Sequence, residues 1–146
     1  MTVTSLPAPR PVLWPLRPQE SARVSRSDDR GRRIITIEHA PLPGVTAEML
    51  AWWYGHVPGT MQYADGTYPR YLVWHPLDHI TYEVENNLDA PVRAGSKLHI
   101  VEALGRDLGS VLDIHVTVEG MNERSAIINR RVHHRCRVEL PLSARV

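Results

Sequence analysis

The second half of the chain alternates apolar and polar positions with a period of two residues. The stretches that show it are Ile80–Val84, Leu98–Leu104, Leu112–Val118 and Val132–Leu140. Because successive side chains of a strand point to opposite faces, this period predicts strands that each bury one face. Turn-forming residues separate the stretches at 86–91, 105–109 and 120–122. The last of these predicts a hairpin turn.

Ahead of these strands, the pattern predicts one strand and one helix. The β-branched run Ile34–Ile37 is typical of a short strand. Thr46 stands where a helix N-cap belongs, because an acidic residue follows it in what would be the first turn. We expect a helix over 47–54 that ends at Gly55. Residues 59–69 are rich in turn formers and predict a loop.

These elements together indicate the class of fold. One strand, one helix and then three or four antiparallel strands predict an α+β domain with a curved antiparallel sheet. No βαβ alternation and no glycine fingerprint for a phosphate group is present in the sequence. Residues 1–32 hold five of the 12 prolines and little periodic apolar pattern. We therefore expect an extended Pro/Arg-rich arm over 1–32 and a single domain over 33–146.

Composition and charge argue against several classes of function and location. The 146 residues carry 17 basic and 16 acidic side chains, so the formal charge of +1 gives no reason to expect a nucleic-acid or membrane partner. The longest wholly apolar stretch, Met49–Tyr54, is far shorter than the ~20 residues that cross a membrane. The single cysteine, Cys136, can form no internal disulfide bond, and 1–33 lack the apolar core of a secretory signal. We expect a soluble, cytoplasmic protein.

The segment Trp74–His79, Trp-His-Pro-Leu-Asp-His, is a first candidate for chemistry. His75 and His79 could each offer an imidazole nitrogen to a metal ion, and Asp78 could orient one of the rings. Pro76 favours a loop here, because the residue before a proline is pushed toward extended geometry. The alternative is that both are loop histidines that hydrogen-bond to the backbone. Two histidines fall short of the three protein ligands of a catalytic zinc site.

Glu102, His134 and His115 are further candidates. Glu102 shares a strand face with apolar residues, where an unpaired carboxylate is costly to bury, so we expect water, a cation or a metal ion beside it. A wet sheet edge would explain Glu102 equally well. His134 lies on the apolar face of the last strand, where a hydrogen-bonded core histidine is the alternative to a ligand. Both, with a histidine of 74–79, would form a set suited to zinc or non-haem iron. Alternation supports His115 less, because its neighbours on that face are polar.

Two sequence blocks resemble the 2,4-diacetylphloroglucinol (DAPG) hydrolase family. They are Glu-Met-x-x-Trp-Trp at 48–53 and Trp-His-Pro-x-Asp-His at 74–79, and the similarity extends over about 40–104. The resemblance implies a shortened member with a helix-grip, Bet v 1-like (START-like) fold, in which a curved antiparallel sheet surrounds a cavity. It also implies zinc-dependent hydrolysis of the carbon–carbon bond between an acyl group and a phenolic or polyketide-type ring.

The same resemblance implies a set of zinc ligands. His79, or else His75, matches one histidine ligand, and Glu102 matches a glutamate ligand. A later histidine ligand matches either His115 or His134. The family's closing His-x-x-x-Glu pair has only an approximate counterpart near the C-terminus, so the site could be completed across a homodimer interface.

The implied reaction also needs a proton donor for the leaving ring carbon. Tyr71 and Tyr82 are the candidates that we name, beside Tyr63 and Tyr68. Zinc, or another divalent metal, would activate water for the attack on the acyl group. The competing hypothesis is a non-catalytic small-molecule binding module or a shortened pseudo-enzyme of the same fold. On either hypothesis the expected partner is a small aromatic or polyketide-like ligand.

Overall fold

The computed structural model describes residues 5–15, 18, 21–86, 91–122, 124–130 and 134–139, without the side chains of 129–130 and 134–139. The chain divides into two compact units, Leu13–Val45 and a larger unit made of Met1–Val12 and Thr46–Val146. Within these described residues, the paired strands are all antiparallel, and the helices are few and short. The predicted mixture of α and β structure with antiparallel sheet is confirmed at this level.

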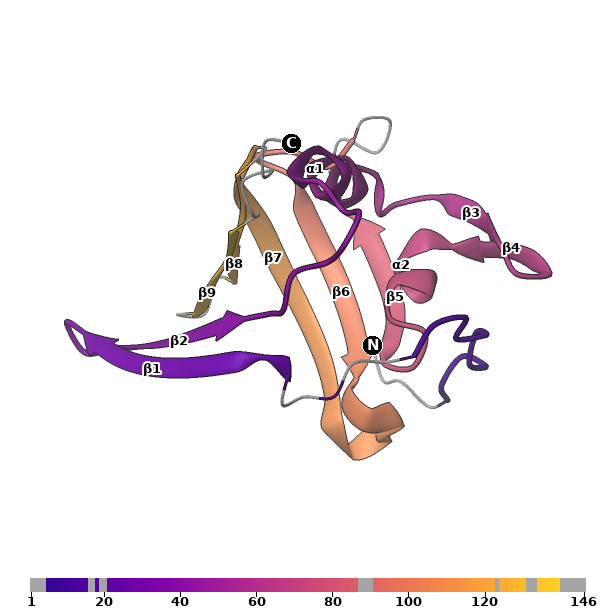
Figure 1. The fold of residues 1–146 in the computed structure, drawn as a ribbon, viewed down its shortest axis with the longest axis horizontal. Helices are drawn as coiled ribbons and strands as arrows, with labels where there is room; N and C mark the ends of the chain where they lie inside the picture. The colour runs from indigo at the N-terminus through magenta and orange to yellow at the C-terminus, as the bar shows by residue number, and fades with distance from the viewer. Residues whose placement is uncertain are drawn as a thin grey trace. The chain divides into compact units, whose positions relative to one another are not determined.

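A five-stranded antiparallel sheet dominates the larger unit, and its strands lie side by side in chain order (Figure 1). They are β5 (His79–Val84), β6 (Lys97–Ala103), β7 (Val111–Asn122), β8 (Ser125–Arg130) and β9 (His134–Glu139). Alternation correctly predicts β5, β6 and the start of β7. Short 3₁₀ turns join β6 to β7 where the sequence predicts a turn.

The hairpin turn predicted at Gly120–Asn122 is wrong, because these residues continue β7 and pair with β8. A register shift next to Gly120 keeps this glycine within the strand. The turn lies later, where the Asn122 side chain accepts hydrogen bonds from the N–H groups of Arg124 and Ser125. The pattern does not predict β8, because Ser-Ala-Ile-Ile-Asn-Arg does not alternate strictly.

Helix α1 (Ala47–His56) begins at the predicted N-cap and runs two residues beyond the predicted range. The Thr46 hydroxyl oxygen accepts a hydrogen bond from the N–H of Met49 and so satisfies one of the free donors of the first turn. The N–H of Val92 donates to the carbonyl oxygen of Gly55 at 2.7 Å. This bond ties α1 to the chain that leads into β6, at the end of the sheet where Figure 1 shows the helix.

The loop predicted at 59–69 is instead a β-hairpin, in which β3 (Thr60–Tyr63) pairs with β4 (Gly66–Pro69). These strands of four residues each are too short to reveal an alternating pattern. Helix α2 (Arg70–Trp74) follows and ends before His75, whose backbone is extended. Pro76 explains this end, because a proline disfavours helical geometry in the residue before it.

The main hydrophobic cluster of the larger unit lies on one face of the sheet, while Val101 and Ala103 of β6 are buried on the opposite face. Its buried members are Val57, Tyr71, Val92, Leu98, Ile100, Val116 and Val118. Leu98 lies opposite Val116, and Ile100 lies opposite Ile114, so the apolar rows seen in the sequence pack against each other. The face of β6 with Leu98, Ile100 and Glu102 is called the inner face. The face with Lys97, His99 and Val101 is called the outer face.

The smaller unit contains the hairpin of β1 (Arg23–Asp29) and β2 (Arg32–Glu38). Arg30 and Gly31 form its two-residue turn with φ values of 48° and 77°, as a type I′ turn requires. The prediction of a strand at Ile34–Ile37 is confirmed. The segment expected to be an arm differs from the prediction, since it contains β1. This strand is almost wholly polar, so its sequence shows no apolar row, and pairing with β2 supplies its structure.

Candidate functional site

His79, Glu102 and Tyr71 meet on the inner face. His79 of β5 lies opposite Glu102 of β6, and its Nε2 atom is 3.4 Å from Glu102 Oε1. The Tyr71 hydroxyl group donates a hydrogen bond of 2.7 Å to the same oxygen. The rings of Tyr71 and His79 stack with their centroids 3.8 Å apart. Side chains from α2, β5 and β6 therefore converge on one carboxylate oxygen.

A β-bulge determines that His79 faces Glu102. Strict alternation would put His79 and Tyr82 on opposite faces of β5. The register shifts around Ile80, however, so that Tyr82 lies opposite Ile100 while His79 lies opposite Glu102. Directly paired residues share a face, so the extra residue brings His79 to the inner face.

Hydrogen bonding determines which nitrogen of His79 carries the proton. Nδ1 is 2.7 Å from the carbonyl oxygen of Tyr71, which can only accept, so Nδ1 donates and the neutral ring keeps a lone pair on Nε2. The His79 side chain is only 12% exposed. Burial lowers the pKa of His79 and outweighs the opposing effect of Glu102. A neutral imidazole with its N–H group held by the backbone is well suited to bind a metal ion.

The two tyrosines named from the sequence lie next to each other, with their ring centroids 5.0 Å apart. Burial raises the pKa of Tyr71, and the hydrogen bond to Glu102 raises it further. Burial also raises the pKa of Tyr82. Both phenols are therefore protonated at neutral pH, and Tyr71 presents its proton directly to the Glu102 carboxylate.

His75 lies beside this group in a different arrangement. Its ring centroid is 5.3 Å from that of His79. Its Nδ1 atom accepts a hydrogen bond of 3.3 Å from the N–H of Asp78 and lies 3.9 Å from Asp78 Oδ2. The proton of the neutral ring is then on Nε2, so His75 must give up this hydrogen bond before it can bind a metal through Nε2. The geometry therefore favours His79 over His75 as a ligand.

Two arginines hold the turn that carries the His75–His79 segment. Arg10 is buried, with 5% of the residue exposed. Arg10 and Arg106 donate to backbone carbonyl oxygens of this turn and of the N-terminal segment, namely Ala8, Leu72, Pro76, Leu77 and Pro7. The carbonyl group of Leu72 is one that the short helix α2 leaves free, and those of Pro76 and Leu77 belong to the turn that follows it. Part of the predicted arm is thus a structural support for the candidate site.

The structure places the remaining candidates elsewhere. His115 is on the outer face, opposite His99, whereas Glu102 is on the inner face. His134 begins β9, which is three strands away from β6 in the sheet. The predicted role of the His134 side chain lies outside the described residues.

A second cluster lies on the outer face and is centred on His99, which the sequence pattern did not single out. His99 Nε2 is 2.7 Å from Asp113 Oδ1, and the rings of His99 and His115 stack with centroids 4.3 Å apart. The hydrogen bond between His99 and Asp113 raises the pKa of the imidazole and lowers that of the carboxyl group. Alternation places His99 on this face, but only the register between β6 and β7 could reveal His115 as its partner.

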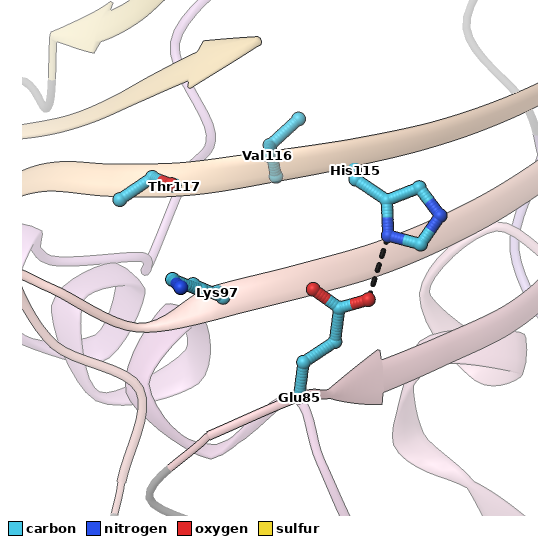
Figure 2. Close-up of a pocket in the computed structure, with 5 residues that line it drawn as sticks. All are labelled: Glu85, Lys97, His115, Val116 and Thr117. Carbon is cyan, nitrogen blue, oxygen red and sulfur yellow. Dashed lines mark hydrogen bonds and ion pairs between the residues drawn. The ribbon is translucent and has the colours of Figure 1, made fainter. Parts of the chain in front are cut away.

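A hollow of about 210 Å³ lies next to this cluster, and Figure 2 shows the residues that line it. Its lining residues are Glu85, Lys97, His115, Val116 and Thr117. Glu85 directly follows β5, and its carboxylate lies 2.6 Å from Nδ1 of His115 in β7. This hydrogen bond therefore passes over β6, as Figure 2 shows. The hydrogen bond between His115 and Glu85 therefore borders the hollow on the outer face.

Comparison with known protein families shows which family the chain belongs to. The family model described as the DAPG hydrolase PhiG domain matches residues 29–116. The chain belongs to this family. The match includes both blocks noted in the sequence and Glu102, and it indicates a hydrolase-like function. No curated protein and no solved structure matches the chain. In the part of the chain that the structure describes, no helix has the length and apolar character to cross a membrane.

Proposed function

We propose that this domain is a zinc-dependent hydrolase that cleaves the carbon–carbon bond between an acyl group and a phenolic or polyketide-type ring. Membership of the DAPG hydrolase PhiG domain family supports the hydrolase-like part of the proposal. The single observation that supports a metal centre is the approach of His79 Nε2 to Glu102 Oε1 on the inner face.

The donor set fits zinc. Ligand bonds of about 2.05 Å at a tetrahedral ion put two ligand atoms about 3.4 Å apart, and His79 Nε2 and Glu102 Oε1 are 3.4 Å apart. Each ligand also has a second contact that fixes its direction, since the carbonyl and hydroxyl groups of Tyr71 bind His79 and Glu102 respectively. His75 would supply a third ligand once its bond to Asp78 opens.

The residues around the ligands suit the proposed chemistry. Bound zinc would polarise the acyl carbonyl group and activate water. Tyr71 holds a proton that it can give to the ring carbon when the carbon–carbon bond breaks, because its raised pKa keeps it neutral. Trp74 packs edge-on against His79 with ring centroids 5.9 Å apart, and Tyr82 packs against Tyr71. These aromatic surfaces favour a small aromatic ligand.

The proposal includes a helix-grip architecture that resembles Bet v 1. The antiparallel sheet supports it, because residues from α2 and from the segment after α1 cover the inner face of the sheet. The homodimer stays a prediction.

Zinc titration of chelator-stripped protein tests the metal centre. Trp74 packs against His79, so tryptophan fluorescence reports on the inner face. We expect a zinc-dependent change in the wild-type protein and in the control Asp113→Asn, which alters the outer face. Glu102→Gln keeps the shape of the side chain but loses its charge, and we expect it to abolish this change. A wild-type protein that gives no zinc-dependent fluorescence change contradicts the metal centre.

Hydrolysis of 2,4-diacetylphloroglucinol, followed by chromatography, then tests the reaction. We expect turnover that requires zinc and that is lost in Glu102→Gln. Quenching of tryptophan fluorescence by this compound without zinc and without turnover would favour the alternative, a non-catalytic binding module.

A further inference from the structure

We propose that the outer face of the sheet carries a second divalent-cation site, formed by His99, Asp113 and His115. One ligand atom from each of the three side chains lies within 4.8 Å of the ligand atoms of the other two. Two imidazoles and one carboxylate form a donor set that suits zinc and related transition metals. The site is separate from the His79–Glu102 pair, because His99 and Glu102 lie on opposite faces of β6.

The pairing of two strands fixes this arrangement. His99 of β6 and His115 of β7 are direct partners in the register, and directly opposed residues of antiparallel strands have Cβ atoms about 5 Å apart. Asp113 precedes His115 by two residues on the same strand, so both lie on the outer face. All three donors therefore project from the middle of a hydrogen-bonded sheet and from no loop.

A carboxylate lies beside Nδ1 of each histidine. Glu85 Oε1 lies 2.6 Å from His115 Nδ1, and Glu83 Oε2 lies 3.6 Å from His99 Nδ1, beyond hydrogen-bond distance. A carboxylate only accepts hydrogen bonds, so His115 Nδ1 keeps its proton and leaves Nε2 to bind a metal ion, while His99 Nε2 is the atom that faces Asp113. This pairing of carboxylate and histidine is the usual support behind a metal ligand.

Two local changes accompany binding. His99 Nε2 shares a proton with Asp113 Oδ1 across 2.7 Å, and a bound cation takes the place of that proton, which is released to solvent. The stacked rings are almost parallel, with 2° between their planes, so their lone pairs do not yet converge. The His115 side chain is 63% exposed and borders the hollow, which leaves space for its ring to turn toward Asp113.

The experiment uses Glu102→Gln protein, full length and without an affinity tag, after removal of metal with a chelator. In this background a bound ion does not depend on the inner site, so failure of this proposal and failure of the proposed function are distinguishable. We expect calorimetric titration with Zn²⁺ to give one ion per chain. Adding His115→Ala should abolish binding, and adding Glu85→Gln should weaken it by roughly 10- to 100-fold. The control His39→Ala removes an exposed histidine of the smaller unit and should leave the affinity unchanged.

Circular dichroism and urea unfolding confirm that each variant is folded. A folded Glu102→Gln protein that binds no Zn²⁺, or one whose affinity survives His115→Ala, overturns the proposal. An independent measurement is the NMR spectrum of the histidine rings with Co²⁺. Paramagnetic shifts confined to His99 and His115 support the site, whereas their absence from these two rings contradicts it.

Discussion

The inner and outer faces of the sheet each bring histidine next to carboxylate, but they do so by different means. On the inner face, the His79–Glu102 pair depends on a β-bulge, on the buried ring of Tyr71 and on the turn that Arg10 holds. On the outer face, the pairing of β6 with β7 is enough to stack His99 on its partner. The inner cluster thus packs within the hydrophobic core, whereas the outer cluster includes the largely exposed His115.

The largest expected difference between the faces is in stability. Leu98→Ala on the inner face, at a residue that is 3% exposed, should lower the free energy of unfolding by about 2–5 kcal/mol because it leaves a cavity. His115→Ala on the outer face should change it by about 0.5 kcal/mol or less, because this side chain is largely exposed. Urea unfolding measures both. Equal losses would show that the outer cluster is also part of the core.

Removal of the Arg10 guanidinium group should affect the inner cluster alone. Arg10→Met leaves buried carbonyl oxygens without their donors, and we expect a loss of about 3 kcal/mol in the free energy of unfolding. Arg23→Met is the control, since Arg23 forms an exposed ion pair with Glu38 that should contribute ~0–1 kcal/mol. If Arg10→Met also weakens Zn²⁺ binding in the Glu102→Gln background, Arg10 supports both faces, which contradicts the difference between them.

The Tyr71 hydroxyl group should stabilise the folded protein through its hydrogen bond to Glu102. Tyr71→Phe keeps the stacked ring but removes a donor to a carboxylate, and we expect a loss of about 2 kcal/mol in the free energy of unfolding. Tyr82→Phe is the matched control, because among the described residues no hydrogen bond of the Tyr82 hydroxyl group is found. Thermal and urea unfolding measure the losses. An equal loss in the two variants would assign the effect to general packing and not to the bond with Glu102.

The smallest expected effect is in the pH dependence of stability, measured in chelator. Burial lowers the pKa of His79 below its ordinary value of about 6.5. The stability that the neutral His79 ring adds is therefore fully present above that pH and is lost as the pH falls. The hydrogen bond to Asp113 raises the pKa of His99, so the stability that the charged His99 ring adds is present below about pH 6.5 and is lost as the pH rises through the folded-state pKa.

The variants His79→Gln and His99→Gln should therefore change the slope of stability against pH in opposite directions. Urea unfolding at a series of pH values between about 5.5 and 8 measures the slope. Slopes that change in the same direction would contradict the contrast between the two faces.

Much of the local structure could be predicted because short-range patterns control it. The alternation over 80–84 and 98–104 predicts β5 and β6, Thr46 marks the start of α1, and Pro76 explains the end of α2. The pattern failed where pairing decides structure, as in β1 and β8, which are strands through their hydrogen-bonded neighbours and not through an apolar row.

Parts of the candidate sites could likewise be predicted from the sequence, and other parts could not. The apolar strand face singled out Glu102, the family resemblance named His79 or else His75, and the sequence predicted that an imidazole and this carboxylate converge. It gave no sign of Arg10 as a support, since the guanidinium group reaches carbonyl oxygens more than 60 residues away in the chain. Nor could it reveal the outer cluster, whose two histidines are brought together only by the pairing of β6 with β7.

The sequence by itself determined the family, the main strands, the start of α1 and the residue types able to hold a metal ion. The tertiary structure decided which of these residues meet. The physical reason is that a strand presents alternate residues to opposite faces, so that one extra residue at Ile80 moves His79 from the outer face to the inner face. Such a register shift depends on hydrogen bonds to a neighbouring strand that is distant in the sequence, so the residues around Ile80 alone do not predict it.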